Sequence, residues 1–495
     1  MAAWAMSHLL STPQFRQAVA RIELRAEKQA DWQRLGDVFV RTDLFDRVRT
    51  SNSQLVLGRR GTGKTHLLRV FENDAAEHGE LVFYVDCTRL ASGYSGLGLA
   101  PEIIAKKYFV SFLNQIGTEL LDKVVRLELP PAGKEHSLIS RLVDGLVPLL
   151  ENANGGESRF NYRQIGTILE DVIAGIGGHR LYIVLDEWAQ VPFSSQPHFA
   201  EYLKRSILAV PQISVKILAV NYQCQFSVRQ NSDIIGLERG ADIPDVIDMD
   251  RYLIYDEKRD FVVDFFAQLL YNHLGVELGW KLSASREEKR RTVESLFTQQ
   301  RTFIELVRAA EGNCRDFLCI FGRAYWDEFR HSSDSRSISI PNIVRAAASW
   351  YDTEKAATIN TEPEAKKTLE FLLNSILKNY KSRTFLVESS KAEHPLLGRL
   401  LNERVLHRLN GTYSHADRPG ILHDLFTIDY GAYVRFRGTV NQVHEEVFWE
   451  GEATKELDVI QKDLLVPVDD KRSIRRITFD PDGLEVAGDT PDKAN

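Results

Sequence analysis

The chain has 495 residues, of which 43% are hydrophobic, 26% charged and 10% aromatic, with a net charge of −7. This balance is ordinary for globular proteins and excludes a disordered chain, a coiled-coil rod and a small disulfide-stapled scaffold. At about 150 residues per domain, the length predicts about three domains. No apolar run is long enough to predict a transmembrane helix, and residues 1–8 lack the basic start of a secretory signal. With only four cysteines, we expect a cytoplasmic protein without a membrane partner.

The first half of the chain alternates short apolar runs with helical periodicity. Residues 12–50 are expected to form an amphipathic helical lead-in. Five apolar runs without polar alternation follow, as in strands that are buried on both faces. We therefore predict an α/β fold in which helices wrap a parallel five-stranded sheet. The predicted strands are Gln54–Leu57, Leu81–Val85, Leu181–Leu185, Val215–Val220 and Val246–Met249.

The connection between the second and third strands, residues 87–180, is unusually long. Its periodicity predicts helices near 101–124, 136–151 and 163–175. We interpret it as a helical insertion in a core that extends over residues 1–255.

Beyond the core, the strand pattern disappears. Residues 256–355 predict a small helical bundle, and a polar linker near 352–364 follows it. Residues 365–450 are predicted as helix, strand, helix and two strands, which is the order of a winged helix. Residues 451–495 are predicted as a polar tail with a turn at Asp480-Pro481-Asp482-Gly483.

The strongest motif is a complete G-x-x-x-x-G-K-T phosphate-binding loop, placed after a predicted strand and before a helix. Glycines allow the backbone to reach φ > 0, so that N–H groups turn towards an anion, and the following helix N-terminus adds a favourable field. Lys64 is expected to reach the β- and γ-phosphates, and the Thr65 hydroxyl to bind Mg²⁺. The residues expected around the nucleotide are Gly58, Arg59, Arg60, Gly61, Thr62, Gly63, Lys64, Thr65 and His66.

A hydrophobic strand that ends in two acids supplies the second half of such a site. In Leu181-Tyr182-Ile183-Val184-Leu185-Asp186-Glu187, we expect Asp186 to hold Mg²⁺ through water and Glu187 to polarise the attacking water. The alternative is that the two acids cap the next helix. Trp188 follows them and is interpreted as a packing residue beside the site, with a position next to the adenine as the alternative.

These motifs resemble the core of AAA+ ATPases. The resemblance extends over residues 35–350 and includes Asn221 at the end of the fourth strand and Gly312-Asn313-Cys314-Arg315 in the helical bundle. By this resemblance the bundle is the AAA+ lid, Asn221 orients the attacking water and Arg315 reaches the γ-phosphate. An ordinary turn asparagine and a solvated helix arginine are the alternatives. The combination of core and winged helix is similar to the origin-recognition initiator branch, and to bacterial P-loop ATPases found beside defence genes.

AAA+ assemblies complete each site with an arginine from a neighbouring subunit. The resemblance therefore implies a homo-oligomer, and position alone makes Arg229 and Arg239 the candidates. The long 87–180 connection departs from the compact pattern of the family, and surface or salt-bridge roles for both arginines remain the alternative.

The third predicted domain is basic within an acidic chain. Residues 366–437 hold 12 Lys and Arg against 7 Asp and Glu. Such an excess is the footprint of a phosphate-backbone partner, so we expect duplex DNA, with protein contacts as the alternative. Arg399 and Arg404 lie on the expected recognition helix. The spacing of His394, His407, His415 and His423 matches no metal-ligand pattern.

The resulting hypothesis is a Mg²⁺-dependent ATPase that couples ATP binding and hydrolysis to DNA binding or subunit assembly. The site residues with catalytic roles are Lys64, Glu187, Asn221 and Arg315, and the metal residues are Thr65 and Asp186. The alternative is an ATP-locked switch with little turnover, which controls a partner effector protein in a bacterial anti-phage defence system.

Overall fold

The computed structural model describes residues 9–22, 31–90, 98–126, 161–175, 180–255, 257–331, 337–380, 382–415, 418–440 and 477–487. The helix predicted near 136–151 lies outside these residues. The chain divides into two compact units. We call Arg41–Gly58 with Lys64–Met249 the sheet unit, and Met1–Val40 with Arg59–Gly63 and Asp250–Asn495 the lid unit.

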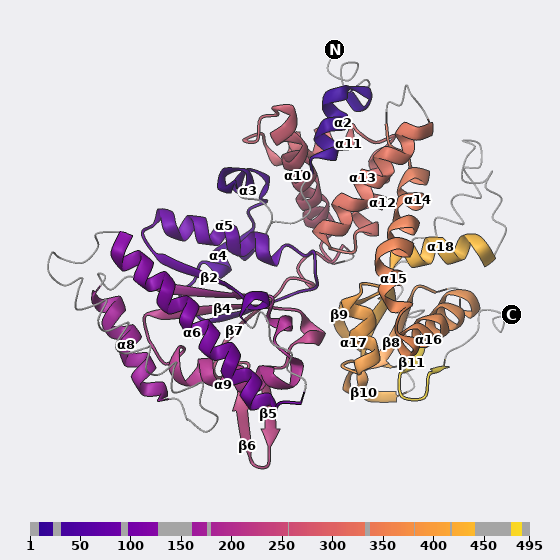
Figure 1. Cartoon of the computed structure of the whole chain (residues 1–495). Helices are drawn as coiled ribbons and strands as arrows, with labels where there is room; N and C mark the ends of the chain where they lie inside the picture. Colours follow the sequence, from indigo (N-terminus) through magenta and orange to yellow (C-terminus); the bar gives the residue numbers. More distant parts are fainter. Residues whose placement is uncertain are drawn as a thin grey trace. The chain divides into compact units, whose positions relative to one another are not determined.

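A parallel five-stranded sheet with the order β2-β3-β4-β1-β7 forms the centre of the sheet unit (Figure 1). All five predicted strands are confirmed, and with them the α/β fold. Every residue of β3 and β4 is buried, as expected for strands covered on both faces. The strands are β1 (Gln54–Leu57), β2 (Leu81–Asp86), β3 (Leu181–Asp186), β4 (Ile213–Ala219) and β7 (Asp245–Asp248).

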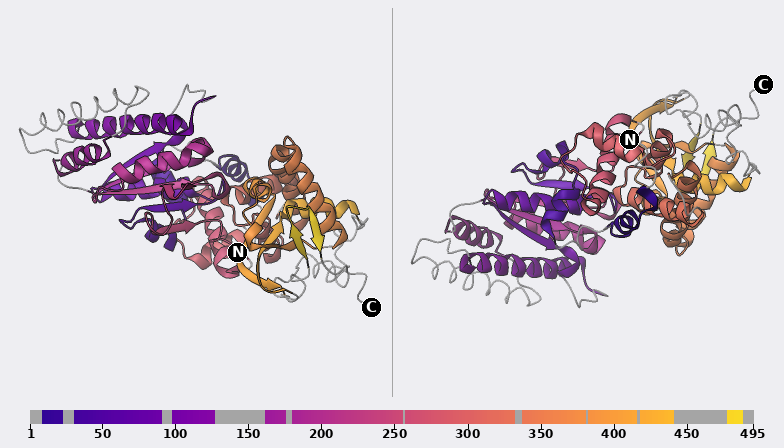
Figure 2. Two further views of the ribbon diagram at one scale, coloured as in Figure 1. Left: turned by 90° about the horizontal axis from the view of Figure 1, so that it is seen from below. Right: turned by 90° about the horizontal axis from the view of Figure 1, so that it is seen from above.

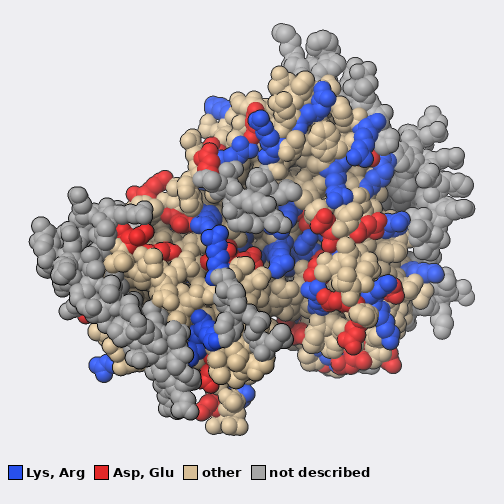
Figure 3. All heavy atoms as spheres, viewed as in Figure 1, with Lys and Arg blue, Asp and Glu red and all other residues tan. Residues whose placement is uncertain are grey.

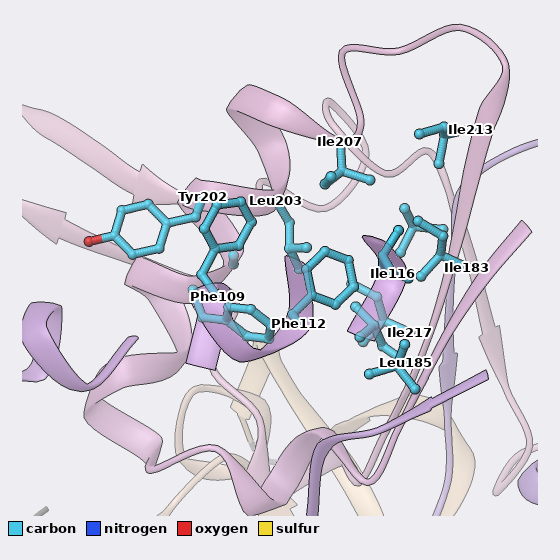
Figure 4. Packing of buried hydrophobic residues seen from close by; sticks show 14 of the residues in the cluster. Phe109, Phe112, Ile116, Ile183, Leu185, Tyr202, Leu203, Ile207, Ile213 and Ile217 are labelled. Atoms are coloured by element: carbon cyan, nitrogen blue, oxygen red, sulfur yellow. The ribbon is translucent and has the colours of Figure 1, made fainter. Parts of the chain in front are cut away.

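One face of this sheet is covered by α6 (Pro101–Arg126), α8 (Tyr162–Gly175) and α9 (Gln196–Ser206). The helices predicted near 101–124 and 163–175 are therefore confirmed. Figure 2 shows α6 running along this face in both views. Phe112 of α6, Leu203 of α9 and Ile217 of the sheet belong to the same buried cluster (Figure 4).

The other face carries α5 (Lys64–Glu77) and α4 (Asp43–Val48). Phe71 of α5 packs edge-to-face on Tyr182 of β3, with ring centroids 5.1 Å apart. Since α5 begins at the lysine of the phosphate-binding loop, this packing fixes the helix N-terminus against the sheet.

An antiparallel hairpin, β5 (Ser227–Gln230) and β6 (Asp233–Gly236), lies between β4 and β7 in the sequence. No strands are predicted here from the sequence, because much of the hairpin is exposed and it lacks a long apolar run. Arg229 lies on β5.

Five helices of the lid unit confirm the predicted bundle. The predicted lead-in is not continuous, however, and is divided between the two units. In the lid unit, α2 (Pro13–Ala20) and α3 (Trp32–Val38) lie near α10, and Arg21 and Arg34 both pair with Glu277. The bundle consists of α10 (Arg259–Leu278), α11 (Arg286–Glu294), α12 (Gln300–Ala309), α13 (Cys314–His331) and α14 (Ile340–Trp350).

The last part of the lid unit has the predicted order of helix, strand, helix and hairpin. Its sheet has the order β12-β11-β8-β10-β9, so the tail adds two strands to it, with the predicted turn between them. That it is a winged helix stays a prediction. The elements are α16 (Pro363–Leu372), β8 (Thr384–Glu388), α17 (Pro395–Asn402), β9 (Leu406–His415), β10 (Arg418–Ile428), α18 (Tyr430–Val440), β11 (Thr478–Asp480) and β12 (Glu485–Ala487).

Among the helices that the structure describes, none combines the length and hydropathy needed to span a bilayer.

Candidate nucleotide-binding site

The phosphate-binding loop leaves the carboxyl end of β1 and leads directly into α5. The N–H of Gly58 donates to the carbonyl of Ala219 at 3.1 Å, which anchors the start of the loop to β4. Gly61 and Gly63 have φ values of +92° and +97°, a region that side chains disfavour. The Lys64 ammonium donates to the Gly58 carbonyl at 2.6 Å and so lies folded over the loop. The backbone therefore has the form that the sequence motif predicts.

Two predicted metal residues from distant parts of the chain meet at the sheet edge. The Thr65 hydroxyl at the start of α5 donates to Asp186 Oδ2 at the end of β3, at 2.9 Å. Asp186 is only 5% exposed. A hydroxyl and a carboxylate are oxygen ligands of the kind Mg²⁺ prefers, so the pair fits the expected metal.

Tyr84 is a third member of this group that the sequence analysis missed. Its hydroxyl, on β2, donates to the same Oδ2 of Asp186. Burial, and after it the negative charge of Asp186, raises the pKa of Tyr84 well above its usual range, so the phenol stays protonated as a donor. The Arg69 guanidinium lies 3.5 Å from the centre of the Tyr84 ring. A tyrosine near the end of the neighbouring parallel strand is the signal that could have identified it.

Glu187 has a left-handed backbone with φ of +53°, which is uncommon for a residue with a side chain. Its N–H donates to Asp186 Oδ1 at 2.8 Å. β3 ends at Asp186, and the chain changes direction at Glu187. Such strained conformations concentrate at functional sites.

Trp188 is fully buried, which confirms its interpretation as a packing residue. Its ring stacks on Phe199 and Phe226, with centroids 5.2 and 5.3 Å away. The indole N–H donates to Gln196 at 3.1 Å. Trp188 thereby fixes the turn that carries Glu187.

Asn221 begins a short 3-10 helix directly after β4. Because β4 lies between β3 and β1 in the sheet, Asn221 follows the strand between the acidic pair and the phosphate-binding loop. This position agrees with the role that the AAA+ resemblance implies, and that role stays a prediction.

In the lid unit, the start of α13 contacts the backbone of the phosphate-binding loop at Arg60 and Gly61. The Asn313 amide donates to the Arg60 carbonyl at 2.8 Å, and the Arg315 N–H donates to the Gly61 carbonyl at 3.1 Å. Asn313 also caps the helix, since its Oδ1 accepts from the N–H of Asp316 at 3.1 Å. The structure thus brings the predicted Arg315 next to the loop and adds Asn313, which the sequence analysis did not assign.

Two glycines in this region lie too close to neighbouring groups to accept a side chain: Gly61 approaches α13, and Gly312 approaches Leu253. A methyl group at Gly61 would lie 2.5 Å from Asn313 Oδ1 and 2.8 Å from Arg315 Cβ. Gly312, with φ of +74°, would place one 2.7 Å from the carbonyl oxygen of Leu253. Both glycines are therefore needed for close approach as well as for backbone conformation.

Arg59 is engaged by protein groups in the lid unit. Its backbone N–H donates to both Asp250 oxygens, at 2.9 and 3.1 Å, and its Nε donates to Asp250 Oδ1 at 3.0 Å. Its Nη1 lies 2.5 Å from His407 Nδ1. That Arg59 contacts nucleotide stays a prediction.

Arg229 and Arg239, the candidates for action in an adjacent subunit, lie on and after the hairpin. Arg229 lies on β5 and is exposed. The Arg239 guanidinium lies 5.4 Å from the centre of the Phe226 ring. A role for either arginine in an adjacent subunit stays a prediction.

Both arginines assigned to the expected recognition helix are paired with acids inside the lid unit. The placement of Arg404 on that helix is wrong, because α17 ends at Asn402 and Arg404 has a left-handed φ of +61°. Arg399 pairs with Glu362 and Glu403, and Arg404 pairs with the fully buried Asp316 at 3.1 Å. Figure 3 shows basic and acidic side chains interspersed over the described surface of the face in view. The excess of basic residues near the C-terminus is therefore partly used in internal ion pairs.

Comparisons with known proteins agree with the first part of this site. Residues 23–97 match the family model described as ORC-CDC6-like. The matched segment contains β1, the phosphate-binding loop, α5 and β2. The predicted resemblance to the origin-recognition branch of AAA+ proteins is confirmed there.

No curated protein sequence matches the chain. Two solved structures can be aligned with most of its length, although with low TM-scores. One is the Drosophila ORC bound to DNA, at 11% identity and a TM-score of 0.31, covering 84% of this chain and 93% of that chain. The other is the Aeropyrum pernix ORC1 protein in complex with DNA, at 14% identity and a TM-score of 0.33, covering 86% of this chain and 97% of that chain. At TM-scores this low, whole chains do not superpose closely.

Proposed function

We propose that the protein binds ATP with Mg²⁺ and hydrolyses it. The observation that carries the proposal is the hydrogen bond between Thr65 and Asp186, which joins the end of β3 to the first turn of α5 beside the lysine of the loop. A phosphate-binding loop alone would support nucleotide binding. The meeting of hydroxyl and carboxylate supports a metal as well.

Different residues of the site would have different roles in phosphoryl transfer. The glycine-rich backbone and the α5 N-terminus would hold the phosphates, and Lys64 would exchange its contact with the Gly58 carbonyl for phosphate oxygens. Mg²⁺ bound at Thr65 and Asp186 would neutralise negative charge on the phosphates. Glu187 would orient a water and accept its proton, and Asn221 would help to orient that water.

The contacts of α13 with the loop give a route from the nucleotide to the rest of the lid unit. Arg315 would reach the γ-phosphate from the first turn of α13, whose N-terminus already contacts Arg60 and Gly61. Loss of the γ-phosphate would then change the position of the lid. We propose that this movement is coupled to duplex DNA binding or to homo-oligomer assembly.

The proposal is tested by ATP binding and ATP turnover with purified wild-type protein, Glu187→Gln and Lys64→Ala. Glu187→Gln should bind ATP like the wild type and lose turnover by about 100-fold or more, since a general base typically contributes that much. Lys64→Ala should lose binding. Glu170→Gln on α8 is the matched control for the loss of one carboxylate and should retain both properties. Wild-type turnover in Glu187→Gln would contradict hydrolysis at this site.

The same assay, repeated with duplex DNA and over a range of protein concentrations, tests the coupling. A rate that rises with DNA, and a specific activity that rises with protein concentration, would support a DNA-responsive assembly with shared sites. DNA binding that is insensitive to salt would contradict a phosphate-backbone contact. Tight ATP binding with negligible turnover would support the alternative, an ATP-locked switch that controls a protein partner.

A further inference from the structure

A buried network of charged side chains extends from the phosphate-binding loop into the last third of the chain. Its residues come from the loop, the bundle and the C-terminal sheet, although all belong to the lid unit. Most of the side chains in it are almost completely enclosed. The members are Arg59, Asp250, Asp316, Lys355, Arg404, His407 and Asp429.

His407 is the member that touches the loop directly. It lies near the start of β9, and its Nδ1 is 2.5 Å from Arg59 Nη1. A guanidinium can only donate, so Nδ1 must be the acceptor. The imidazole is then neutral with its proton on Nε2, and that N–H donates to Asp429 Oδ2 at 3.1 Å. The two neighbours of His407 thus determine both its protonation state and its tautomer.

The pKa of His407 agrees with this assignment. Burial, and after it the positive charge of Arg59, lowers the pKa to about 3. The imidazole therefore remains an acceptor for Arg59 across the physiological range.

Asp429 fixes His407 in turn. Its Oδ1 accepts from the Gly431 N–H at 2.9 Å at the start of α18, and its Oδ2 accepts from Lys355 at 2.6 Å. A carboxylate with this many donors has one favourable orientation, and that orientation directs the His407 ring towards Arg59.

A second path runs from the same sheet to the loop. Arg404, two residues before β9, donates to Asp316 Oδ2 at 3.1 Å, and Lys355 pairs with the same carboxylate at 3.0 Å. Asp316 belongs to the first turn of α13, where Asn313 holds the Arg60 carbonyl at 2.8 Å. Two neighbouring groups of the loop are therefore held by paths that lead to the C-terminal sheet. The Arg59 guanidinium is held by His407, and the Arg60 carbonyl is held by Asn313 at the start of α13.

We propose that His407 is a positioning residue of the phosphate-binding loop, acting through Arg59. It rests on the proposed binding of ATP. Arg59 is the first residue after Gly58, and between Asp250 and His407 its backbone N–H and its guanidinium are held at the same time. Such restraint pre-orders the loop, so that less conformational freedom is lost when phosphate binds. The C-terminal sheet thereby contributes to nucleotide affinity without touching nucleotide.

The test compares full-length wild type, His407→Leu, His407→Gln, Arg59→Met and the double variant Arg59→Met with His407→Leu. The readouts are the Kd for a fluorescent ATP analogue and amide hydrogen exchange of residues 58–65 without nucleotide. We expect His407→Leu to weaken binding about tenfold, as for loss of a hydrogen bond to a charged group. His407→Gln can still accept from Arg59 and donate to Asp429, so it should restore affinity to within about threefold of the wild type. Faster exchange of the loop amides in His407→Leu is expected too.

The double variant shows whether His407 acts through Arg59. Its loss of affinity should be about that of Arg59→Met alone, because the contact between His407 and Arg59 is already lost in Arg59→Met and the two losses are therefore not additive. His423→Leu on β10 is the matched control, a buried histidine of the same sheet, and should leave the Kd unchanged. A Kd and a loop exchange rate in His407→Leu equal to those of the wild type would overturn the proposal, as would additive losses in the double variant.

Failure of the proposed function gives a different result. If the wild type does not bind the ATP analogue, ATP binding is refuted, and hydrogen exchange of the loop still decides whether His407 positions it. If His407→Leu does not fold, His407→Gln and Arg59→Met together carry the decision. In that case the proposal is contradicted if His407→Gln folds normally but has a Kd more than tenfold above that of the wild type. Glutamine would then fail to replace the imidazole as the hydrogen-bond acceptor for Arg59.

Discussion

Thr65 and Asp186 are 121 residues apart in the sequence, yet the threonine hydroxyl donates a 2.9 Å hydrogen bond to the aspartate carboxylate. The parallel sheet brings these two distant parts of the sequence together, because β1 and β3 end at the same edge of the sheet with only β4 between them. In α/β proteins this edge, at the carboxyl ends of the strands, is where ligands bind. The pair therefore marks the centre of the proposed site.

Tyr84 should affect the metal more than the nucleotide. Tyr84→Phe removes the hydroxyl that donates to Asp186 Oδ2. It keeps the aromatic ring that the Arg69 guanidinium contacts. A freer carboxylate should raise the Mg²⁺ concentration for half-maximal ATP binding by about two- to tenfold, as for other changes around metal ligands. The measurement is ATP-analogue binding over a Mg²⁺ titration. Tyr108→Phe, which removes a hydroxyl that donates to Gln190, is the control. An unchanged Mg²⁺ midpoint in Tyr84→Phe would contradict this role.

Gly61 should be needed for the contact with α13 as well as for its own conformation. Gly61→Ala would place a methyl group against Asn313 and Arg315, whereas Gly79→Ala has a similar positive φ and open space around it. Both variants should lose about 1 kcal/mol of unfolding free energy from backbone strain. Gly61→Ala alone should also weaken ATP binding, by tenfold or more. Denaturant unfolding and ATP binding measure the two effects, and equal ATP affinity in the two variants would refute the contact.

Lys355 should be among the most important single charges for stability of the lid unit. It is almost completely buried and pairs with both Asp316 and Asp429. Lys355→Met would leave two buried carboxylates without this partner and should cost about 3–5 kcal/mol of unfolding free energy. Lys366→Met, which breaks an exposed pair with Glu370 at 3.9 Å, should change it by less than about 0.5 kcal/mol. Urea unfolding compares the two. Similar values would mean that the buried network is not stabilised by its central cation.

His407 should make stability depend on pH below neutrality. Its neighbours are Arg59, Asp429 and Lys355, and its folded pKa of about 3 lies below the ordinary value of 6.5. Between these values the unfolded chain binds the proton and the folded chain does not, so stability falls as pH falls. The slope from this group approaches about 1.4 kcal/mol per pH unit.

Urea unfolding at pH 7, 6 and 5 measures that slope. His407→Gln should flatten it, and His198→Gln on α9 is the control with the same substitution in the sheet unit. Equal slopes in the wild type and His407→Gln would contradict a neutral buried imidazole. Asp316 adds a separate loss at lower pH, because its folded pKa of about 2, held low by Lys355 and Arg404, lies below 3.8. Its stabilisation is present above 3.8 and disappears as pH falls through 2.

Local sequence was sufficient for the elements that carry a local signal. All five strands of the parallel sheet were predicted because each is a short apolar run, and the five bundle helices because of their periodicity. The β5–β6 hairpin was missed since exposed strands without an apolar run resemble loops. The lead-in was predicted as one amphipathic segment, but its helices divide between the two units, and periodicity does not say which neighbour a helix packs against.

The sequence by itself predicts the chemistry of the phosphate-binding loop and of the acidic strand end, because glycine, lysine and acidic residues at fixed spacing allow few other uses. Only the tertiary structure showed that Tyr84 joins Asp186, that Asn313 holds the loop and that His407 reaches Arg59 across 348 residues of sequence. These contacts depend on strand order and on the packing of the lid unit. A buried histidine such as His407 has no local signature, since its role follows from the partner that the fold places beside it.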